Sequence, residues 1–184
     1  YNVVQRDYEI MMKQLLTLDA GNYEECTGLL EKVSTRGIIF RGDKIAMQRN
    51  AAGIYKIPGG GVEANESYIQ ALIREVAEET GLIIIEESIR EIGEITELRQ
   101  DIFEPDKKFV RHNLFYFAQV KDVTVPLKMT DSEKERGFHL HWATLEEIYN
   151  TNMSLISHDL TTPDKDMIFI KMLLDSEIKM TGQQ

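Results

Sequence analysis

The segment from Ser67 to Gly81 carries the start and stop signals of a helix, and it constrains the fold more than any other part of the chain. Ser67 and Gln70, three places apart, form the pattern of a capping box, and Gly81 suits the left-handed residue just past a helix end. Three consecutive glycines at positions 59–61 precede this segment. The sequence therefore predicts a glycine loop that leads into a capped helix over residues 67–80.

The predicted helix has an apolar face and a separate acidic face. At roughly 100° per residue, the residues within about 80° of Ile69 include Leu72, Ile73, Val76 and Ala77. Glu75, Glu78 and Glu79 lie at roughly 240°, 180° and 280° from the same reference. Like charges at this spacing cost roughly a few tenths of a kcal/mol each on an exposed helix, so the cluster calls for a compensating cation. Carboxylate oxygens favour Mg²⁺ or Mn²⁺, whereas a plain solvated face is the alternative.

The residues around these glutamates follow a spacing with many fixed positions. Five residues separate Gly60 from Glu66, seven separate Glu66 from Arg74, and residues 74–82 read REVAEETGL. This pattern matches every fixed position of the Nudix box, G-x5-E-x7-R-E-U-x-E-E-x-G-U, in which U is aliphatic. Over residues 60–82 the sequence therefore resembles the Nudix hydrolase family.

The resemblance implies a fold and a reaction. The fold is an α/β/α sandwich with a mixed β-sheet. The reaction is hydrolysis of a pyrophosphate bond in a nucleoside diphosphate linked to another moiety, by attack of a water molecule that Mg²⁺ or Mn²⁺ activates. The alternative from another class is a non-catalytic Nudix module that binds a nucleotide and regulates a partner. Such modules usually lose glutamates of the box, and this sequence keeps all four.

The resemblance also assigns roles to residues of the box and its surroundings. Glu66 and Arg74 resemble the pair that orients the catalytic helix, and both Glu78 and Glu79 are candidates for the group that accepts the proton of the water. A further glutamate from a distant loop completes the site in some members. Glu133 and Glu135 are the candidates here, with Glu133 favoured and a solvated loop as the alternative. The implied metal ligands are Glu75, Glu78, Glu79, Glu133 and the backbone carbonyl of Gly59.

Three residues just before the glycines are candidates for substrate binding. Arg49 and Lys56 carry charges that suit a phosphate, and Tyr55 carries a ring that suits stacking on a base. Exposed loop residues of these types without a role are the alternative. His139 and His141 share one face of a predicted strand, but paired packing or surface histidines are commoner than ligands, so we do not count them as ligands.

Differences from the sequence signatures of known Nudix subclasses narrow the range of possible substrates. The proline found shortly beyond the box in ADP-ribose hydrolases is absent, because the first proline after Gly81 is Pro105. The longer signature of NADH-cleaving members is missing too. Isopentenyl diphosphate isomerases use a catalytic cysteine close to the box, whereas the only cysteine here, Cys26, lies far upstream. Both hydrolase subclasses are therefore disfavoured, and the isomerase more so.

Charge and composition exclude further classes. The formal net charge of −10 argues against broad binding to nucleic acid or to an anionic membrane. The negative net charge is compatible with a small phosphorylated substrate, because a bound divalent cation reverses the local electrostatic field. Removal of pyrophosphate from RNA ends stays a minor option. A single cysteine favours a reducing, cytoplasmic setting, and no apolar stretch is long enough to span a membrane. The resemblance leaves a homodimer open.

The remaining sequence predicts one domain over residues 1–184, with no linker or repeat to divide it. Residues 1–35 form a lead-in that fits either a helix or a strand. A hairpin is expected over residues 37–47, with its turn at 41–43. The expected strands are 83–85, 92–98, 110–120 and 138–142, and the expected helices run from 144 to 148 and onward from 163.

Overall fold

The computed structural model describes residues 12–155 and 164–175. Its strands are β1 (Gln14–Asp19), β2 (Gly28–Ile38), β3 (Phe40–Arg41), β4 (Lys44–Arg49), β5 (Tyr55–Lys56), β6 (Leu82–Ile84), β7 (Arg90–Gln100), β8 (Lys107–Phe117), β9 (Val120–Thr124) and β10 (His139–Thr144). Its helices are α1 (Tyr68–Thr80), the 3-10 turn η1 (Glu86–Ser88), α2 (Asp131–Glu135), α3 (Leu145–Leu155) and α4 (Lys165–Leu174).

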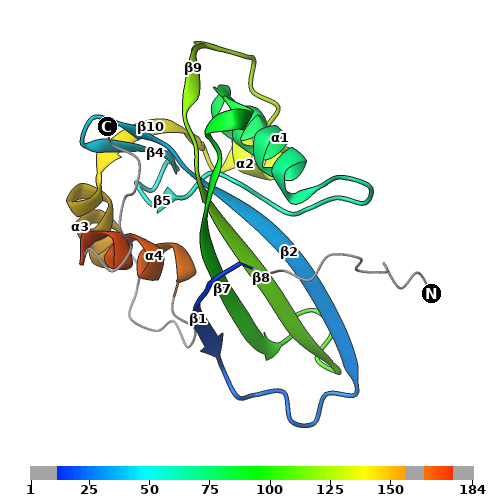
Figure 1. Cartoon of the computed structure of the whole chain (residues 1–184). Helices are drawn as coiled ribbons and strands as arrows, with labels where there is room; N and C mark the ends of the chain where they lie inside the picture. Colours follow the sequence, from blue (N-terminus) through cyan, green and yellow to red (C-terminus); the bar gives the residue numbers. More distant parts are fainter. Residues whose placement is uncertain (1–11, 156–163, 176–184) are drawn as a thin grey trace.

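A four-stranded mixed sheet is the central element, in the order β1-β7-β8-β2 (Figure 1). β7 and β8 run antiparallel, whereas β1 joins β7 and β2 joins β8 in parallel. A second sheet has the order β10-β4-β3, with β5 paired to β4, and β6 pairs with β9. The glycine loop continues the central sheet, because Gly61 forms an isolated bridge with Ser34 of β2.

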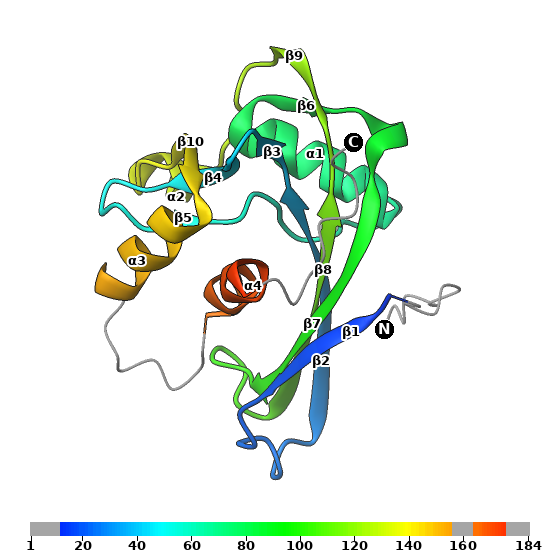
Figure 2. The same ribbon diagram turned by 60° about the vertical axis from the view of Figure 1, so that its left-hand side comes forward.

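Helices cover the sheets from two sides, as Figures 1 and 2 show, with α1 on one side and α3 and α4 on the other. Ile38 and Ile39 are adjacent in the chain but belong to different core clusters, because successive strand residues point to opposite faces. Ile38 packs in the cluster that includes Phe169 of α4. Ile39 packs in the cluster that includes Leu72 of α1. The α/β/α arrangement with a mixed sheet is thus confirmed.

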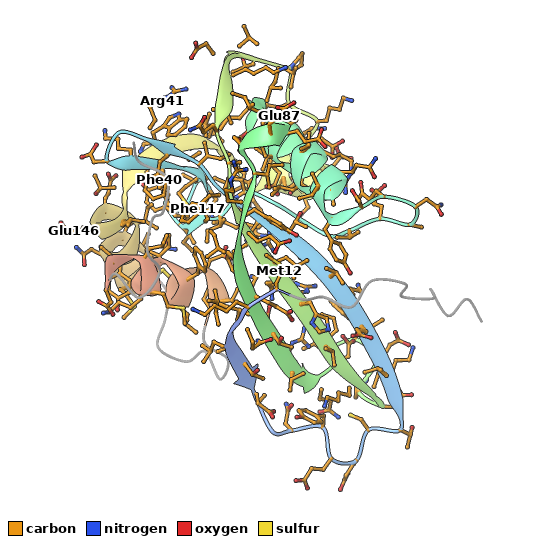
Figure 3. All side chains as sticks on the ribbon, viewed as in Figure 1. Met12, Phe40, Arg41, Glu87, Phe117 and Glu146 are labelled. Atoms are coloured by element: carbon orange, nitrogen blue, oxygen red, sulfur yellow. The ribbon has the colours of Figure 1, made fainter. Side chains whose placement is uncertain are left out.

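Aromatic pairs fix the α4 side of the core. The rings of Phe115 and Phe169 stack with centroids 3.9 Å apart, which attaches α4 to β8. Phe40 and Phe117, labelled in Figure 3, tilt against each other at 6.2 Å. These contacts hold α4 where its first turn meets the loop that follows β5.

The lead-in, whose local pattern fits either a helix or a strand, forms strands in its described part. Residues 14–19 form a strand rather than a helix, and β2 begins at Gly28, ahead of the expected start near residue 35. Both pair with strands that lie far along the chain, so tertiary pairing decides their structure. The part of the lead-in before residue 12 lies outside the described residues.

The other expected elements are present with shifted ends. The hairpin turn is formed with Gly42 in the left-handed region, at φ 64°. The expected strand over residues 110–120 is divided, because β8 ends at Phe117 and the chain then pairs with β6 as β9. α3 runs on to Leu155, well past residue 148. Among the described residues, no helix has the length and apolarity to cross a membrane.

Candidate active site

Helix α1 is set by the end signals that its sequence carries. The Ser67 hydroxyl accepts from the Gln70 N–H at 3.1 Å, and the Gln70 side chain accepts from the Ser67 N–H at 2.8 Å. At the other end, Gly81 has φ 74° and donates its N–H to Ala77. The predicted capping box and glycine C-cap are both confirmed. Because the apolar face of α1 packs into the core, the opposite face presents its carboxylates to the glycine loop.

Arg74 and Glu66 form a two-bonded ion pair between α1 and the loop before it. Arg74 Nε lies 3.0 Å from Glu66 Oε2, and Arg74 Nη2 lies 2.6 Å from Glu66 Oε1. The same Nη2 donates to the Gly61 carbonyl at 3.0 Å. The hydrogen bonds from Arg74 lower the pKa of Glu66, even though partial burial opposes this. The pair therefore ties the glycine loop to the helix.

The same guanidinium also contacts the two carboxylates on its own helix. Arg74 Nη1 donates to Glu75 at 2.8 Å and lies 3.3 Å from Glu78. Hydrogen bonds to Glu66 and Glu75 raise the pKa of Arg74 above its ordinary value, so it stays charged. Part of the positive charge that the acidic face requires is thus supplied from within the helix.

Glu79 differs from its neighbours because it is almost completely buried, with 3% of its surface exposed. Its carboxylate accepts the Gly59 N–H at 2.7 Å and lies 3.3 Å from Lys56 Nζ. With its amide nitrogen turned inward, Gln48 donates to both carboxylate oxygens at 3.2 Å. Burial raises the pKa of Glu79 to about 7, against the lowering effects of Lys56 and the Gly59 N–H. This carboxyl group can therefore exchange a proton near neutral pH.

The glycine loop is held from both sides of the sheet. Gly59 has φ 134°, and a Cβ there would collide with the Thr35 carbonyl, so the close approach requires glycine. The Gly59 carbonyl accepts a hydrogen bond from Arg36. Two residues before Gly59, the Ile57 N–H donates to the buried carboxylate of Asp166 on α4 at 3.0 Å. The loop conformation is thus determined by charged groups from three elements.

Glu133 comes from a separate element, α2, and reaches the same place. It accepts from the N–H and the hydroxyl of Thr130, both at 2.8 Å, in the capping box of α2. Burial would raise the pKa of Glu133, but the Thr130 hydrogen bonds, the charge of Lys56 and a hydrogen bond with Glu79 outweigh it and lower the pKa. Glu133 is therefore beside Glu79 and Lys56, whereas Glu135 is exposed.

Comparison with known families accounts for this arrangement. The NUDIX domain model matches residues 31–163, which is more than half of the chain. This chain belongs to the Nudix family. Nudix hydrolases act on pyrophosphate bonds in nucleotide-like small molecules, generally with divalent cations. Comparison with the curated proteins gives no match.

Three solved structures with a TM-score above 0.5 share the fold. A NUDIX hydrolase from Nitrosomonas europaea is 21% identical, with a TM-score of 0.56, over 81% of this chain and 92% of that one. The E. coli ORF135 protein is 18% identical, with a TM-score of 0.55, over 84% and 96% of the two chains. A MutT NUDIX hydrolase from Burkholderia pseudomallei is 19% identical, with a TM-score of 0.52, over 77% and 97%. At these identities the likeness concerns the fold alone.

The three residues predicted to bind substrate divide between two faces of β4 and β5. Lys56 lies opposite Gln48 in the register, and both side chains reach Glu79 of the Nudix box. Tyr55 lies opposite Arg49 and points to the other face, where it is 2% exposed and packs in the core. Its hydroxyl donates to Glu147 at 2.9 Å, so no open ring face is left to stack on a base. Only Lys56 of the three joins the box glutamates.

The two histidines of β10 are also apart from the Nudix box. His139 lies opposite Arg49 in the register and is exposed, and its Nδ1 lies 3.1 Å from the Gly137 carbonyl. His141 lies 3.9 Å from Glu147. They thus lie with Arg49 on the face away from Glu79.

Three residues that contact the site lie outside the predicted set, namely Arg36, Gln48 and Asp166. Arg36 and Asp166 are charged yet only 4% exposed each, and Gln48 is fully buried. A signal for Arg36 is its place directly before the apolar run GIIF, in the segment STRGIIF. The sequence around Gln48 and Asp166 carries no comparable signal, because their partners lie on distant segments.

The residues present suit a hard divalent cation. The donors near the loop are carboxylate and carbonyl oxygens from α1, α2 and Gly59, which are the ligand types that Mg²⁺ prefers. A Cβ on Gly60 would collide with the Glu75 carboxylate, so the glycine preserves the space that this carboxylate occupies. Across residues 12–155 and 164–175 no three acidic, histidine or cysteine side chains form a ready-made cage, and Arg74 lies among the carboxylates instead. Cation binding would therefore exchange contacts of Arg74 for contacts with the metal.

Proposed function

We propose that this chain is a Mg²⁺-dependent or Mn²⁺-dependent Nudix hydrolase that cleaves the pyrophosphate bond of a nucleoside diphosphate linked to another moiety. The observation that carries the proposal is the acidic face of α1, where Glu66, Glu75 and Glu78 surround Arg74 next to the glycine loop. A regulatory module has no need for this complete set of carboxylates. The cytoplasm is the proposed setting, on the basis of the single cysteine.

The oxygen donors that we assign to the cation are Glu75, Glu78, Glu79, Glu133 and the Gly59 carbonyl. When bound, the cation supplies neutralisation of charge on the phosphate oxygens and acidification of a water molecule. Lys56, which is about one-third exposed beside Glu79, is assigned to an anionic oxygen of the diphosphate. Glu66 and Arg74 are positioning residues, because their ion pair fixes α1 against the loop that presents Gly59.

Glu78 is the better placed of the two candidates for proton acceptor. The oxygens of Glu79 are occupied by Gly59, Lys56 and Gln48 in a site closed to solvent. Glu78 is one-third exposed, and its single contact with Arg74 is long, at 3.3 Å. A general base must come within hydrogen-bond reach of the water, so the accessible carboxylate is preferred.

A release assay for phosphate and nucleotide tests the proposal. Wild-type protein is incubated with Mg²⁺ and nucleoside triphosphates, sugar nucleotides, dinucleoside polyphosphates or 5′-triphosphate RNA. We expect turnover of one class, a loss of about 10² to 10⁴ in kcat for Glu78→Gln, and no loss for Glu87→Gln, an exposed glutamate on η1. Equal rates in the wild type and Glu78→Gln would refute the assigned role. Nucleotide and metal binding without any cleavage would favour the regulatory module.

A further inference from the structure

Three arginines share the face of the central sheet that α4 partly covers. Arg111 on β8 lies opposite Lys32 of β2 and Glu97 of β7, and Arg99 lies opposite Phe109, two residues before Arg111. Register partners share a face and so do residues two apart, which puts the side chains of Arg99 and Arg111 on one surface. Arg36 lies on the same face, four residues along β2 from Lys32. In Figures 1 and 2 this part of the sheet extends beyond the helices.

An aromatic ring holds two of these arginines together. The guanidinium carbons of Arg99 and Arg111 lie 4.2 Å and 5.0 Å from the centroid of Phe109, which is buried beneath them. Such cation–π contacts offset part of the repulsion between like charges. Burial lowers the pKa of Arg111, and the nearby charges of Arg36 and Arg99 act in the same direction. The arginines thus lie close together although their like charges repel one another.

Two donors in this cluster are buried without a hydrogen-bond partner among the described residues. They are Nε of Arg36 and Nε of Arg111. The charge of Glu97 acts on Arg111, but this carboxylate already accepts from Asn113 at 2.8 Å. Asp166, near Arg36, is balanced by Lys165 at 3.6 Å. Asp101, near Arg99, already accepts from the N–H groups of Phe103 and Glu104. Buried donors are normally paired, so the unpaired Nε of Arg111 beside Arg99 favours an anion as its partner.

The cluster begins at the candidate active site and runs away from it. Arg36 donates to the Gly59 carbonyl, so one end touches the glycine loop, and Arg99 marks the other end near the tip of β7. We propose that Arg99 and Arg111, which share the ring of Phe109, bind a further phosphate group on the part of the substrate that lies away from the cleaved diphosphate. This inference rests on the proposed function and names its substrate class, a nucleoside diphosphate derivative with an additional phosphate.

Binding of inorganic phosphate without metal tests the cluster apart from hydrolysis. Calorimetry in the presence of a chelator compares wild-type protein with Arg111→Gln, Arg99→Gln and Arg90→Gln. Arg90 is an exposed arginine on the same strand as Arg99, where it contacts backbone carbonyls. Loss of a charge-assisted contact predicts affinity about 10- to 100-fold weaker in the first two variants and unchanged affinity in Arg90→Gln. Equal phosphate affinity in all four proteins, or none in the wild type, would overturn the assignment.

Kinetics with a matched substrate pair connect the cluster to the reaction. The pair is a sugar nucleotide and the same compound with a phosphate monoester on its sugar. We expect wild-type protein to have the lower KM for the phosphorylated compound, and Arg111→Gln to reduce this preference about 10- to 100-fold, with partial rescue in Arg111→Lys. A preference that is absent from the wild type or unchanged in Arg111→Gln would contradict the inference. Phosphate binding with no cleavage of either compound would contradict the proposed function instead. The phosphate-binding role of the arginine cluster would still stand.

Discussion

Asn152 on α3 is expected to control the stability of β5, the strand that carries Lys56 into the site. Its Nδ2 donates to the Tyr55 carbonyl and its Oδ1 accepts from the Tyr55 N–H, both at 2.8 Å. The side chain is 1% exposed, so no solvent competes for these bonds. Replacement of Asn152 by alanine would leave both backbone groups of Tyr55 buried without their partner.

The magnitude follows from these two bonds. Each buried group left unpaired costs about 1–3 kcal/mol, and alanine returns about 0.5 kcal/mol through its better helix propensity. The expected loss in the free energy of unfolding is therefore about 1.5–5.5 kcal/mol for Asn152→Ala. In a chain of this size, 1 kcal/mol corresponds to roughly 2–4 °C, so Tm should fall by about 3–22 °C.

Urea unfolding, followed by the fluorescence of the single tryptophan, Trp142, measures this loss. The matched control is Asn150→Ala, which makes the same substitution at an exposed position of the same helix. The control should be neutral or slightly stabilising, because it gains the helix propensity and loses no buried contact. If Asn152→Ala and Asn150→Ala agree within about 0.5 kcal/mol, the two bonds do not hold β5 and the reasoning is wrong.

Two further predictions concern Gly60 and His112. Gly60→Ala should weaken Mg²⁺ binding, measured by calorimetry, because the new Cβ collides with the Glu75 carboxylate; affinity equal to the wild type would contradict this. Hydrogen bonds to Glu94 and then to Glu31 raise the pKa of His112. Its stabilising effect is therefore complete below about pH 6.5 and is lost as pH rises through the raised value. Unfolding at about pH 6 and about pH 9 should show a larger loss of stability in the wild type than in His112→Gln, and equal losses would exclude the ion pairs as the cause.

Helix α1 could be predicted from the sequence because its determinants are local. Ser67, Gln70 and Gly81 act on backbone groups within one turn of themselves, so their types suffice to place both ends of α1. The contact between Glu66 and Arg74 likewise spans only eight residues. The spacing of the box therefore contains both the element and the ion pair that fixes it.

The remaining features depend on distant partners. β2 pairs with β8 over its whole length, and this pairing carries the strand back to Gly28, where the local pattern is weak. The different positions of Tyr55 and Lys56 follow from strand alternation, but only once β5 is known to pair with β4. Asp166 meets Ile57 across 109 residues, and nothing near either residue indicates the other.

The anchoring of the glycine loop by α4 has a consequence for synthesis of the chain. The Ile57 N–H donates to Asp166, and Phe169, six residues before the last described residue, fills the core beside Phe115. A chain growing on the ribosome can form α1 and its caps early, since those contacts are local. The loop beside α1 acquires its full set of bonds only after residues 165–174 have emerged. We therefore expect the proposed activity to arise only late in the synthesis of the chain.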